Sequence, residues 1–131
     1  MTQEKLKQFL DACYDAKRLV EHLPDLPDGM KPRQVHVLDA VNEIQKKQGF
    51  CRVSDISSYM NTTLPSITKL VQELEERNLL VKQADEKDKR VINLTLTEEG
   101  KEFVELRVTH FHGEWASRLP DLDDAVVDEF V

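Results

Sequence analysis

Apolar positions recur along the first segment, residues 2–23, with the rhythm of a helix. They are spaced three and four residues apart and form a single seam at positions 6, 9, 13, 16, 20 and 23. This spacing predicts an amphipathic helix, and so regular a seam is typical of helices that pack against other helices. The stretch PDLPDGMKP then ends the pattern with prolines and a glycine.

A second helix is predicted from Pro32 to the stretch KKQG. Proline is favourable in the first turn of a helix, and Gly49 is a suitable residue for the C-terminal cap. A short extended piece is expected next, at residues 50–52. The apolar positions of this helix that we expect to point inward are Val35, Leu38, Val41 and Ile44.

Two further helices, over residues 53–60 and 64–77, are predicted on either side of a polar turn at residues 61–63. Thr63 can cap the second of them, because its hydroxyl can accept from the first-turn amides. Asn78 is expected to end that helix in the left-handed conformation. The apolar positions expected inside these two helices are Ile56, Met60, Ile67, Leu70, Val71 and Leu74.

Two strands are predicted at residues 79–83 and 91–97, joined by a block of charge. The second strand alternates, with Ile92, Leu94 and Leu96 on one face. Between the strands, all six residues from 85 to 90 are charged. The order of elements therefore predicts a helix-turn-helix followed by a two-stranded wing.

The C-terminal part is predicted to be helical. Thr97 can cap a helix over residues 98–119, and the two glutamates that follow suit the positive end of its dipole. Pro120 ends this helix, and a last helix is expected over residues 122–131. The positions expected to point inward are Val104, Val108, Phe111, Trp115, Leu119, Leu122, Val126 and Phe130. The fold class is mainly α, in the form of a winged helix-turn-helix.

Charge is distributed unevenly along the 131 residues. The net charge is −7, which argues against a protein that coats nucleic acid or anionic membrane without selectivity. Residues 52–93, however, hold seven basic and seven acidic side chains, so the excess acid lies in the remainder. The stretch after Met1 is too polar for a secretory leader, and no apolar run approaches a membrane span. We therefore expect a cytoplasmic protein with no membrane association.

The exposed face of the helix at 64–77 is small, polar or basic near its N-terminus, and its acids gather toward the C-terminus. A helix that enters the major groove N-terminus first would place that end against the bases. On the wing, long cationic side chains can reach phosphates or a narrow minor groove. Asp88 can hold Arg90 in an extended pose. The expected DNA contacts are Thr63, Pro65, Ser66, Thr68, Lys69, Gln72, Lys87, Lys89 and Arg90, with Asp85 and Asp88 as supports of the wing.

At this point the chain resembles the MarR family of winged helix-turn-helix repressors. The motif LVQELEERNLLVK resembles the end of the family's recognition helix, and DEKDKRVINLTLTEEG resembles its wing signature. Asn78 stands where the family usually has glycine, but asparagine tolerates the left-handed conformation. Lys87 stands where many members carry arginine, which keeps the charge and loses the bidentate geometry.

The resemblance implies a homodimer that straddles a pseudo-palindromic operator in double-stranded DNA. Helices at about 1–30 and 98–131 would form the dimer, and residues 31–97 would form the DNA-binding lobe. It also implies a small-molecule effector, often aromatic or anionic, bound between the two parts. The residues expected to line its pocket are Tyr14, Arg18, His36, Phe111 and Trp115.

Other functions remain open alternatives. Cys13 could sense oxidants, although its place on the apolar seam also suits a small core residue. His110 and His112 are two apart, which places them on different helix faces and argues against a metal site. The chain has only four glycines and no phosphate-cradling loop or hydrolase motif, so we expect neither an enzyme nor a cofactor. A winged-helix module that binds protein instead of DNA is the last alternative, because the chain is acidic overall and Glu73 lies on the recognition face.

Overall fold

The computed structural model describes residues 1–21, 26–27, 29–117 and 124–130. Its contacts divide the chain into two compact units, residues Met1–Met30 and Lys31–Val131. Among the residues described, the secondary structure is helical except for one two-stranded antiparallel sheet. The predicted fold class, a mainly helical winged helix-turn-helix, is confirmed.

The first unit contains α1 (Gln3–Glu21). Its seam was expected to be covered, but Leu6 and Phe9 are 45% and 49% exposed, and Cys13 is exposed as well. A seam of this kind is buried only where it packs against a second surface, and the described residues of the first unit provide none. Positions 22–25 lie outside the described residues, and so does the side chain of position 20.

The second unit begins with α2 (Pro32–Gln48), which is followed by the helix-turn-helix pair α3 (Val53–Met60) and α4 (Leu64–Glu76). Gly49 caps α2 with a φ of 84°, and Asn78 follows α4 with a φ of 60°. Both left-handed positions were predicted. The core of this unit draws on the three helices, the sheet and the segment between α2 and α3. Its fully buried residues, each 0% exposed, are Val37, Leu38, Val41, Cys51, Ile56, Ile67, Val71, Leu74 and Leu94.

The buried face of α2 differs from the prediction at one position. Val35 is half-buried, and Val37 is buried in its place. Successive steps of three residues rotate by about 300° each, so positions 35, 38, 41 and 44 drift around a helix of 3.6 residues per turn. The face that packs inward instead combines steps of three and four. On α3, Ile56 is buried as expected, while Met60 is half-buried.

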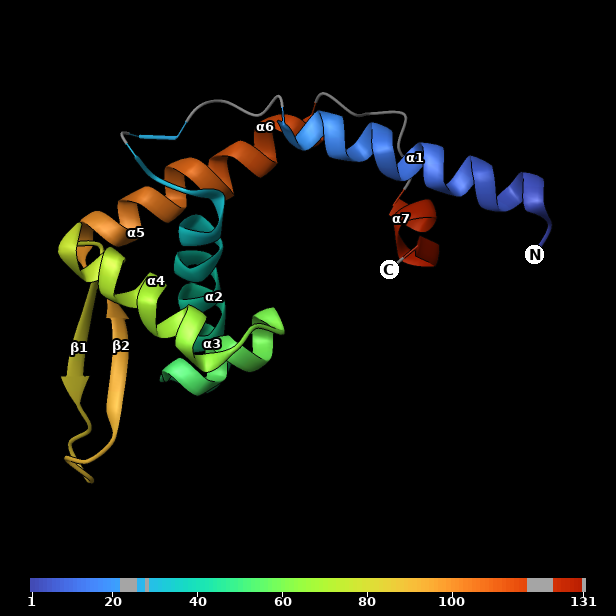
Figure 1. Ribbon diagram of the computed structural model, residues 1–131. Helices are drawn as coiled ribbons and strands as arrows, with labels where there is room; N and C mark the ends of the chain where they lie inside the picture. Colours follow the sequence, from blue (N-terminus) through green and yellow to red (C-terminus); the bar gives the residue numbers. More distant parts are fainter. Residues whose placement is uncertain (22–25, 28, 118–123, 131) are drawn as a thin grey trace. The chain divides into compact units, whose positions relative to one another are not determined.

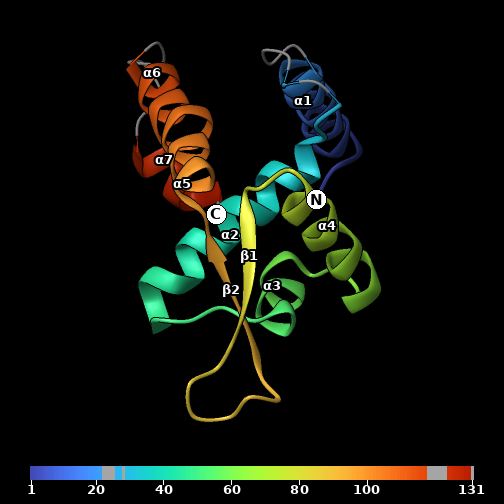
Figure 2. The ribbon, with the colours of Figure 1, turned by 90° about the vertical axis from the view of Figure 1, so that its left-hand side faces the viewer.

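The wing consists of β1 (Leu80–Ala84) and β2 (Ile92–Leu96), paired from Leu80 with Leu96 to Ala84 with Ile92. Its tip projects beyond α3 and α4 in both views of the chain (Figures 1 and 2). Leu94 and Leu96 are buried as predicted, whereas Ile92 is 42% exposed because it lies at the end of the hairpin that leaves the core.

The expected extended piece at 50–52 does not form a strand. It is joined to β2 by one backbone bond, from the Leu94 N–H to the Cys51 carbonyl, at 2.7 Å.

The helix that follows the wing contains an irregular segment. It runs as α5 (Glu98–Val104), the π-helical segment η1 (Glu105–His110) and α6 (Phe111–Ser117). The wider π turn interrupts the 3.6-residue period on which the prediction relied. Val104 is buried as expected, but Val108 and Phe111 are only half-buried.

The last helix, α7, is described over Asp124–Phe130, and its predicted start at residue 122 lies outside the described residues. Several positions predicted to point inward lie outside what the structure describes: residues 119 and 122, and the side chains of positions 115, 126 and 130.

The base of the wing is fastened to the start of α5. The Thr97 hydroxyl caps that helix by accepting from the Gly100 N–H at 3.0 Å, as predicted, and donates to the Asn78 carbonyl at 2.7 Å. The Thr97 N–H donates to the Leu79 carbonyl at 3.1 Å. A Cβ at position 100 would lie 2.1 Å from that carbonyl oxygen. Glycine is therefore required there by close packing against backbone.

Candidate nucleic-acid interface

The turn between α3 and α4 is closed by its own backbone and side chains. Asn61 adopts a left-handed conformation with a φ of 50°. The Thr62 N–H donates to the Ser57 carbonyl at 3.0 Å, and the Ser57 hydroxyl donates to the Thr62 carbonyl. These bonds fix the direction in which α4 leaves the turn, which is the requirement for a helix that must enter a groove.

The N-terminus of α4 presents small polar groups to solvent. The Thr63 hydroxyl accepts from the Ser66 N–H at 3.4 Å and donates to the Ser66 hydroxyl at 2.9 Å. Ser66 is half-buried, and its hydroxyl takes part in the cap. The other expected DNA contacts on this helix are exposed: Thr63, Pro65, Thr68, Lys69 and Gln72. Their side chains share one surface that can contact base edges and phosphates.

Two of the three acids of α4, Glu73 and Glu75, are held by partners on other elements. A Glu73 carboxylate oxygen accepts from the Gln34 side-chain amide of α2 at 2.7 Å. The Glu75 carboxylate forms an ion pair with Lys82 of β1, with 3.0 Å between nitrogen and oxygen. Glu73 is half-buried, so it is not a free anion on the recognition face. This weakens the argument from Glu73 for a protein-binding module, and the net acidity of the chain is the other observation behind that alternative.

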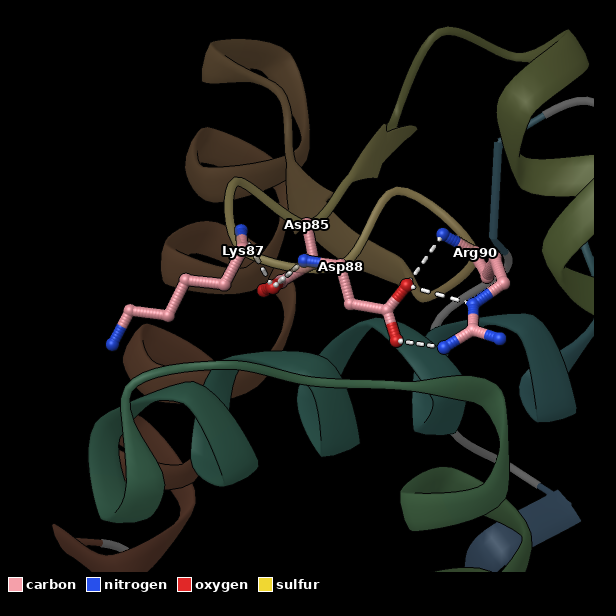
Figure 3. Close-up of polar contacts among 4 residues, drawn as sticks. All are labelled: Asp85, Lys87, Asp88 and Arg90. Carbon is pink, nitrogen blue, oxygen red and sulfur yellow. Dashed lines mark hydrogen bonds and ion pairs between the residues drawn. The ribbon is translucent and has the colours of Figure 1, made fainter.

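Asp85 organises the tip of the wing, as Figure 3 shows. One of its carboxylate oxygens accepts from the backbone N–H groups of Lys87 and Asp88, each at 3.1 Å, and the other accepts from the Asn93 side chain at 3.0 Å. These bonds, led by the one from Asn93, lower the pKa of Asp85 below 3.8. The tip is thus an ordered loop built around a carboxylate, not only a solvated run of charge.

Asp88 braces Arg90. Its carboxylate accepts from the Arg90 side chain at 3.1 Å from Nε and 3.2 Å from an outer nitrogen, and from the Arg90 backbone N–H at 3.1 Å. The guanidinium is the main reason why the pKa of Asp88 is lowered. The side chain of Arg90 is nevertheless 91% exposed. The brace fixes the extended pose and leaves the remaining guanidinium N–H donors for another acceptor.

The two wing lysines complete the basic tip. Lys87 and Lys89 are both exposed, and the Lys87 side chain extends away from the two aspartates in Figure 3. Within the described parts of the chain, neither lysine side chain takes part in an ion pair. Both are therefore available to phosphates.

Two polar residues that support the wing were missed by the sequence reasoning. Asn93 lies on β2 and reaches back across the loop to Asp85. Arg52 stacks over the Phe50 ring with 4.7 Å between the guanidinium carbon and the ring centroid, and its charge helps to lower the pKa of both wing aspartates. The only sequence signal for Asn93 is a polar residue on the outer face of β2. Arg52 gave none, because the two wing aspartates on which its charge acts are more than thirty residues away.

The predicted effector residues do not form one site within either unit. Tyr14 and Arg18 lie on α1 in the first unit, and His36 is exposed on α2. Phe111 begins α6, and the side chain of Trp115 is outside the described residues. An open depression of about 520 Å³ lies along α5 and η1, and it is lined by Lys101, Glu102, Glu105, Leu106 and His110. None of the predicted residues lines it.

The two cysteines lie in opposite environments. Cys51 is fully buried in the core, and desolvation raises the pKa of its thiol to about 12. Cys13 is exposed, contrary to the expectation that it lies on a covered seam.

In the part of the chain that the structure covers, no three His, Cys, Asp or Glu side chains gather to hold a metal. No helix there combines the length and the apolar character needed to cross a bilayer.

A helix-turn-helix with a braced basic wing defines the class of the protein, a winged helix-turn-helix. A family model described as "MarR family" matches residues 28–91, the stretch that holds the helix-turn-helix, the first strand of the wing and its tip. The chain is 38% identical over 72 residues to the HTH-type transcriptional repressor MdtR of Bacillus subtilis (strain 168). That match covers 55% of this chain and 44% of MdtR, so it spans less than half of the relative.

Two solved structures share the fold over nearly the whole chain. Streptococcus pneumoniae FabT in complex with DNA superposes with a TM-score of 0.74 at 18% identity, over 98% of this chain and 90% of FabT. S. aureus MepR bound to ethidium bromide superposes with a TM-score of 0.62 at 20% identity, over 99% and 89% of the two chains. At these identities the likeness is one of fold.

Proposed function

We propose that the chain is a dimeric, sequence-specific regulator of transcription that binds double-stranded DNA and acts as a repressor released by a small molecule. The observation that carries the proposal is the pairing of two exposed surfaces on one unit. The N-terminal part of α4 presents Lys69 and small polar side chains, and the wing presents Arg90 in a braced, extended pose. The helix would read base edges, and the wing would grip the flanking backbone or minor groove.

Electrostatics support the DNA-binding part of the proposal. A helix that carries free carboxylates would be repelled by phosphates. Here the Glu73 and Glu75 carboxylates are tied to Gln34 and Lys82, and the wing aspartates are engaged in bonds to the tip. The cations expected to meet DNA, Lys69, Lys87, Lys89 and Arg90, are all exposed. The DNA complex of FabT shows that a protein of this fold can be captured on a duplex.

The homodimer is supported by α1. Its apolar seam leaves Leu6 45% and Phe9 49% exposed, and burying such a row against a second copy would be favourable. A two-fold dimer would place two copies of α4 on one face and would favour a pseudo-palindromic site. We assign the dimer to the helices at about 1–30 and 98–131, and DNA binding to residues 31–97.

The effector rests on a fold-level argument. MepR, which shares the fold, was captured with ethidium bromide, and an effector acts by binding one of two states more tightly. We keep Tyr14, Arg18, His36, Phe111 and Trp115 as the residues to test for ligand binding. A ligand screen scored by release of a labelled duplex, followed by substitution of Tyr14 and His36, tests this assignment.

Selection of duplexes from a random pool tests the proposed function. We expect enrichment of a two-fold symmetric sequence, bound by two chains for each duplex. Substitution of Thr68 and Gln72 should change the enriched sequence. A pool that stays random after repeated rounds would refute sequence-specific DNA binding.

Because Cys13 is exposed, oxidation of its thiol is an alternative to ligand binding as the signal that releases the protein from DNA. Peroxide should then release the wild-type protein from the selected duplex and leave the Cys13→Ser variant bound. Equal behaviour of the two proteins would exclude Cys13 as the sensor.

A further inference from the structure

Gln34 is the one buried polar residue among those that the structure describes, with 3% of its surface exposed. It lies in the first turn of α2. A buried amide must satisfy both its oxygen and its nitrogen, because an unpaired polar group in a core is costly. The two hydrogen-bond partners of its side-chain amide therefore indicate the role of this residue.

The two ends of the Gln34 side chain contact different parts of the unit. Its carbonyl oxygen accepts from the Lys31 N–H at 2.9 Å, and its nitrogen donates to the Glu73 carboxylate at 2.7 Å. The first contact is local and closes the start of α2. The second spans 39 residues of sequence and reaches α4. Charge-assisted hydrogen bonds of this kind are stronger than neutral ones and are geometrically specific.

Glu73 lies on α4 one residue beyond Gln72, an expected DNA contact. A carboxylate released at this point would lie close to the DNA phosphates and would oppose binding. The bond from Gln34 holds that carboxylate against α2 and fixes the rotation of α4 about its own axis. Both effects favour the orientation in which Thr68, Lys69 and Gln72 are exposed.

We propose that Gln34 is a positioning residue for DNA binding, which acts through Glu73 to orient α4 and to keep its carboxylate away from the duplex. This inference rests on the proposed function.

A residue exchange provides the sharpest test. Q34E places two carboxylates in contact, and E73Q removes the charge that the amide binds. The double variant Q34E/E73Q rebuilds the pair in reverse, since a carboxylate at position 34 can accept from both the Lys31 N–H and the new amide. We expect Q34E to weaken binding of a selected duplex about tenfold or more, and the double variant to recover to within about threefold of wild type.

Alanine variants separate positioning from a general loss of stability. Q34A should weaken binding about tenfold in the wild-type background and have little effect in the E73A background. Q48A is the matched control, because Gln48 also lies on α2 and donates to a carboxylate at 3.1 Å, but that carboxylate belongs to Asp55 of α3. The proposal is overturned if Q34A and Q48A lose equal affinity for the duplex, or if Q34A lowers the affinity equally in both backgrounds. It is also overturned if Q34E/E73Q does not recover affinity.

Hydrogen exchange of the free protein distinguishes this proposal from the proposed function. Amides of α4 should exchange faster in Q34A than in wild type or Q48A, and Q34E/E73Q should return them toward wild type. If wild type binds no duplex, the proposed function fails whatever the exchange shows. If wild type binds and α4 exchanges alike in all variants, only the role of Gln34 fails.

Discussion

Substitution of Gly100 by alanine tests how the wing is fastened to the helix that follows it. A Cβ at this position would lie 2.1 Å from the Leu79 carbonyl oxygen, whereas real Cβ contacts are essentially never under 3.0 Å. The chain must therefore move by at least about 0.9 Å, the difference between these two distances. The atom in the way belongs to the backbone, so no side-chain rotation can relieve the clash.

The cost can be worked from three contributions. Overpacking of this kind costs about 1–3 kcal/mol. Moving the Leu79 carbonyl also weakens its bond from the Thr97 N–H, which contributes about 1 kcal/mol. Alanine offsets about 1 kcal/mol through its higher helix propensity. The net destabilisation is about 2 kcal/mol, which lowers the Tm by about 6–8 °C in a chain of this size.

Gly113→Ala is the matched control. Gly113 also lies in a helix, but nothing lies within 4 Å of a Cβ built there. Alanine should therefore raise the Tm by up to about 3–4 °C through propensity alone. The assay is thermal unfolding followed by circular dichroism at one fixed protein concentration. A Gly100→Ala variant as stable as wild type would refute the reasoning, because the close approach to Leu79 would then not exist.

Three further predictions concern the wing and the cysteines. Arg90→Ala should lower the affinity for a selected duplex by about tenfold in a fluorescence anisotropy titration. Arg33→Ala, which removes an exposed arginine from α2, should change this affinity little. Equal losses of affinity in the two variants would exclude a special role of the wing. A thiol reagent should label Cys13 in the native protein and reach Cys51, with its pKa of about 12, only after unfolding; rapid native labelling of both would contradict the core. The pKa of Asp85 is lowered from 3.8, so the contribution of its bonds to stability is fully present above pH 3.8 and is lost as the pH falls through the lower value. A carbon NMR titration of Asp85 with its midpoint at or above 3.8 would show that these bonds are absent.

The helix-turn-helix could be predicted well because its signals are local. Thr63 as a cap, Asn78 as a left-handed stop and the apolar spacing of α4 each depend on residues within a turn of one another. The same holds for the Asp88 brace on Arg90, where the two residues are two positions apart.

Contacts between distant segments could not be predicted. Gln34 and Asn93 are polar residues whose partners lie across the fold, and nothing in their neighbourhoods distinguishes them from surface residues. The π-helical segment Glu105–His110 was not predicted, because an analysis of apolar spacing assumes a constant number of residues per helical turn. Burial at Ile92 was overestimated because alternation predicts a face of a strand but not how far the strand extends beyond the core.

The α1 seam shows a different limit. Its spacing predicted a covered face, and the helix is present, yet Leu6 and Phe9 remain exposed in one chain. Sequence periodicity indicates that a surface is suited to packing but does not say which molecule provides the partner. The proposed dimer supplies that partner.

The most direct test of the central claim is the salt dependence of DNA binding, measured by anisotropy with a selected duplex and a scrambled one. Contact by two recognition helices and two wings predicts that log affinity falls steeply and linearly with log salt. At physiological salt the selected duplex should bind at least about a thousandfold more tightly than the scrambled one. Equal affinity for both duplexes, or no binding to either at low salt, would contradict the account.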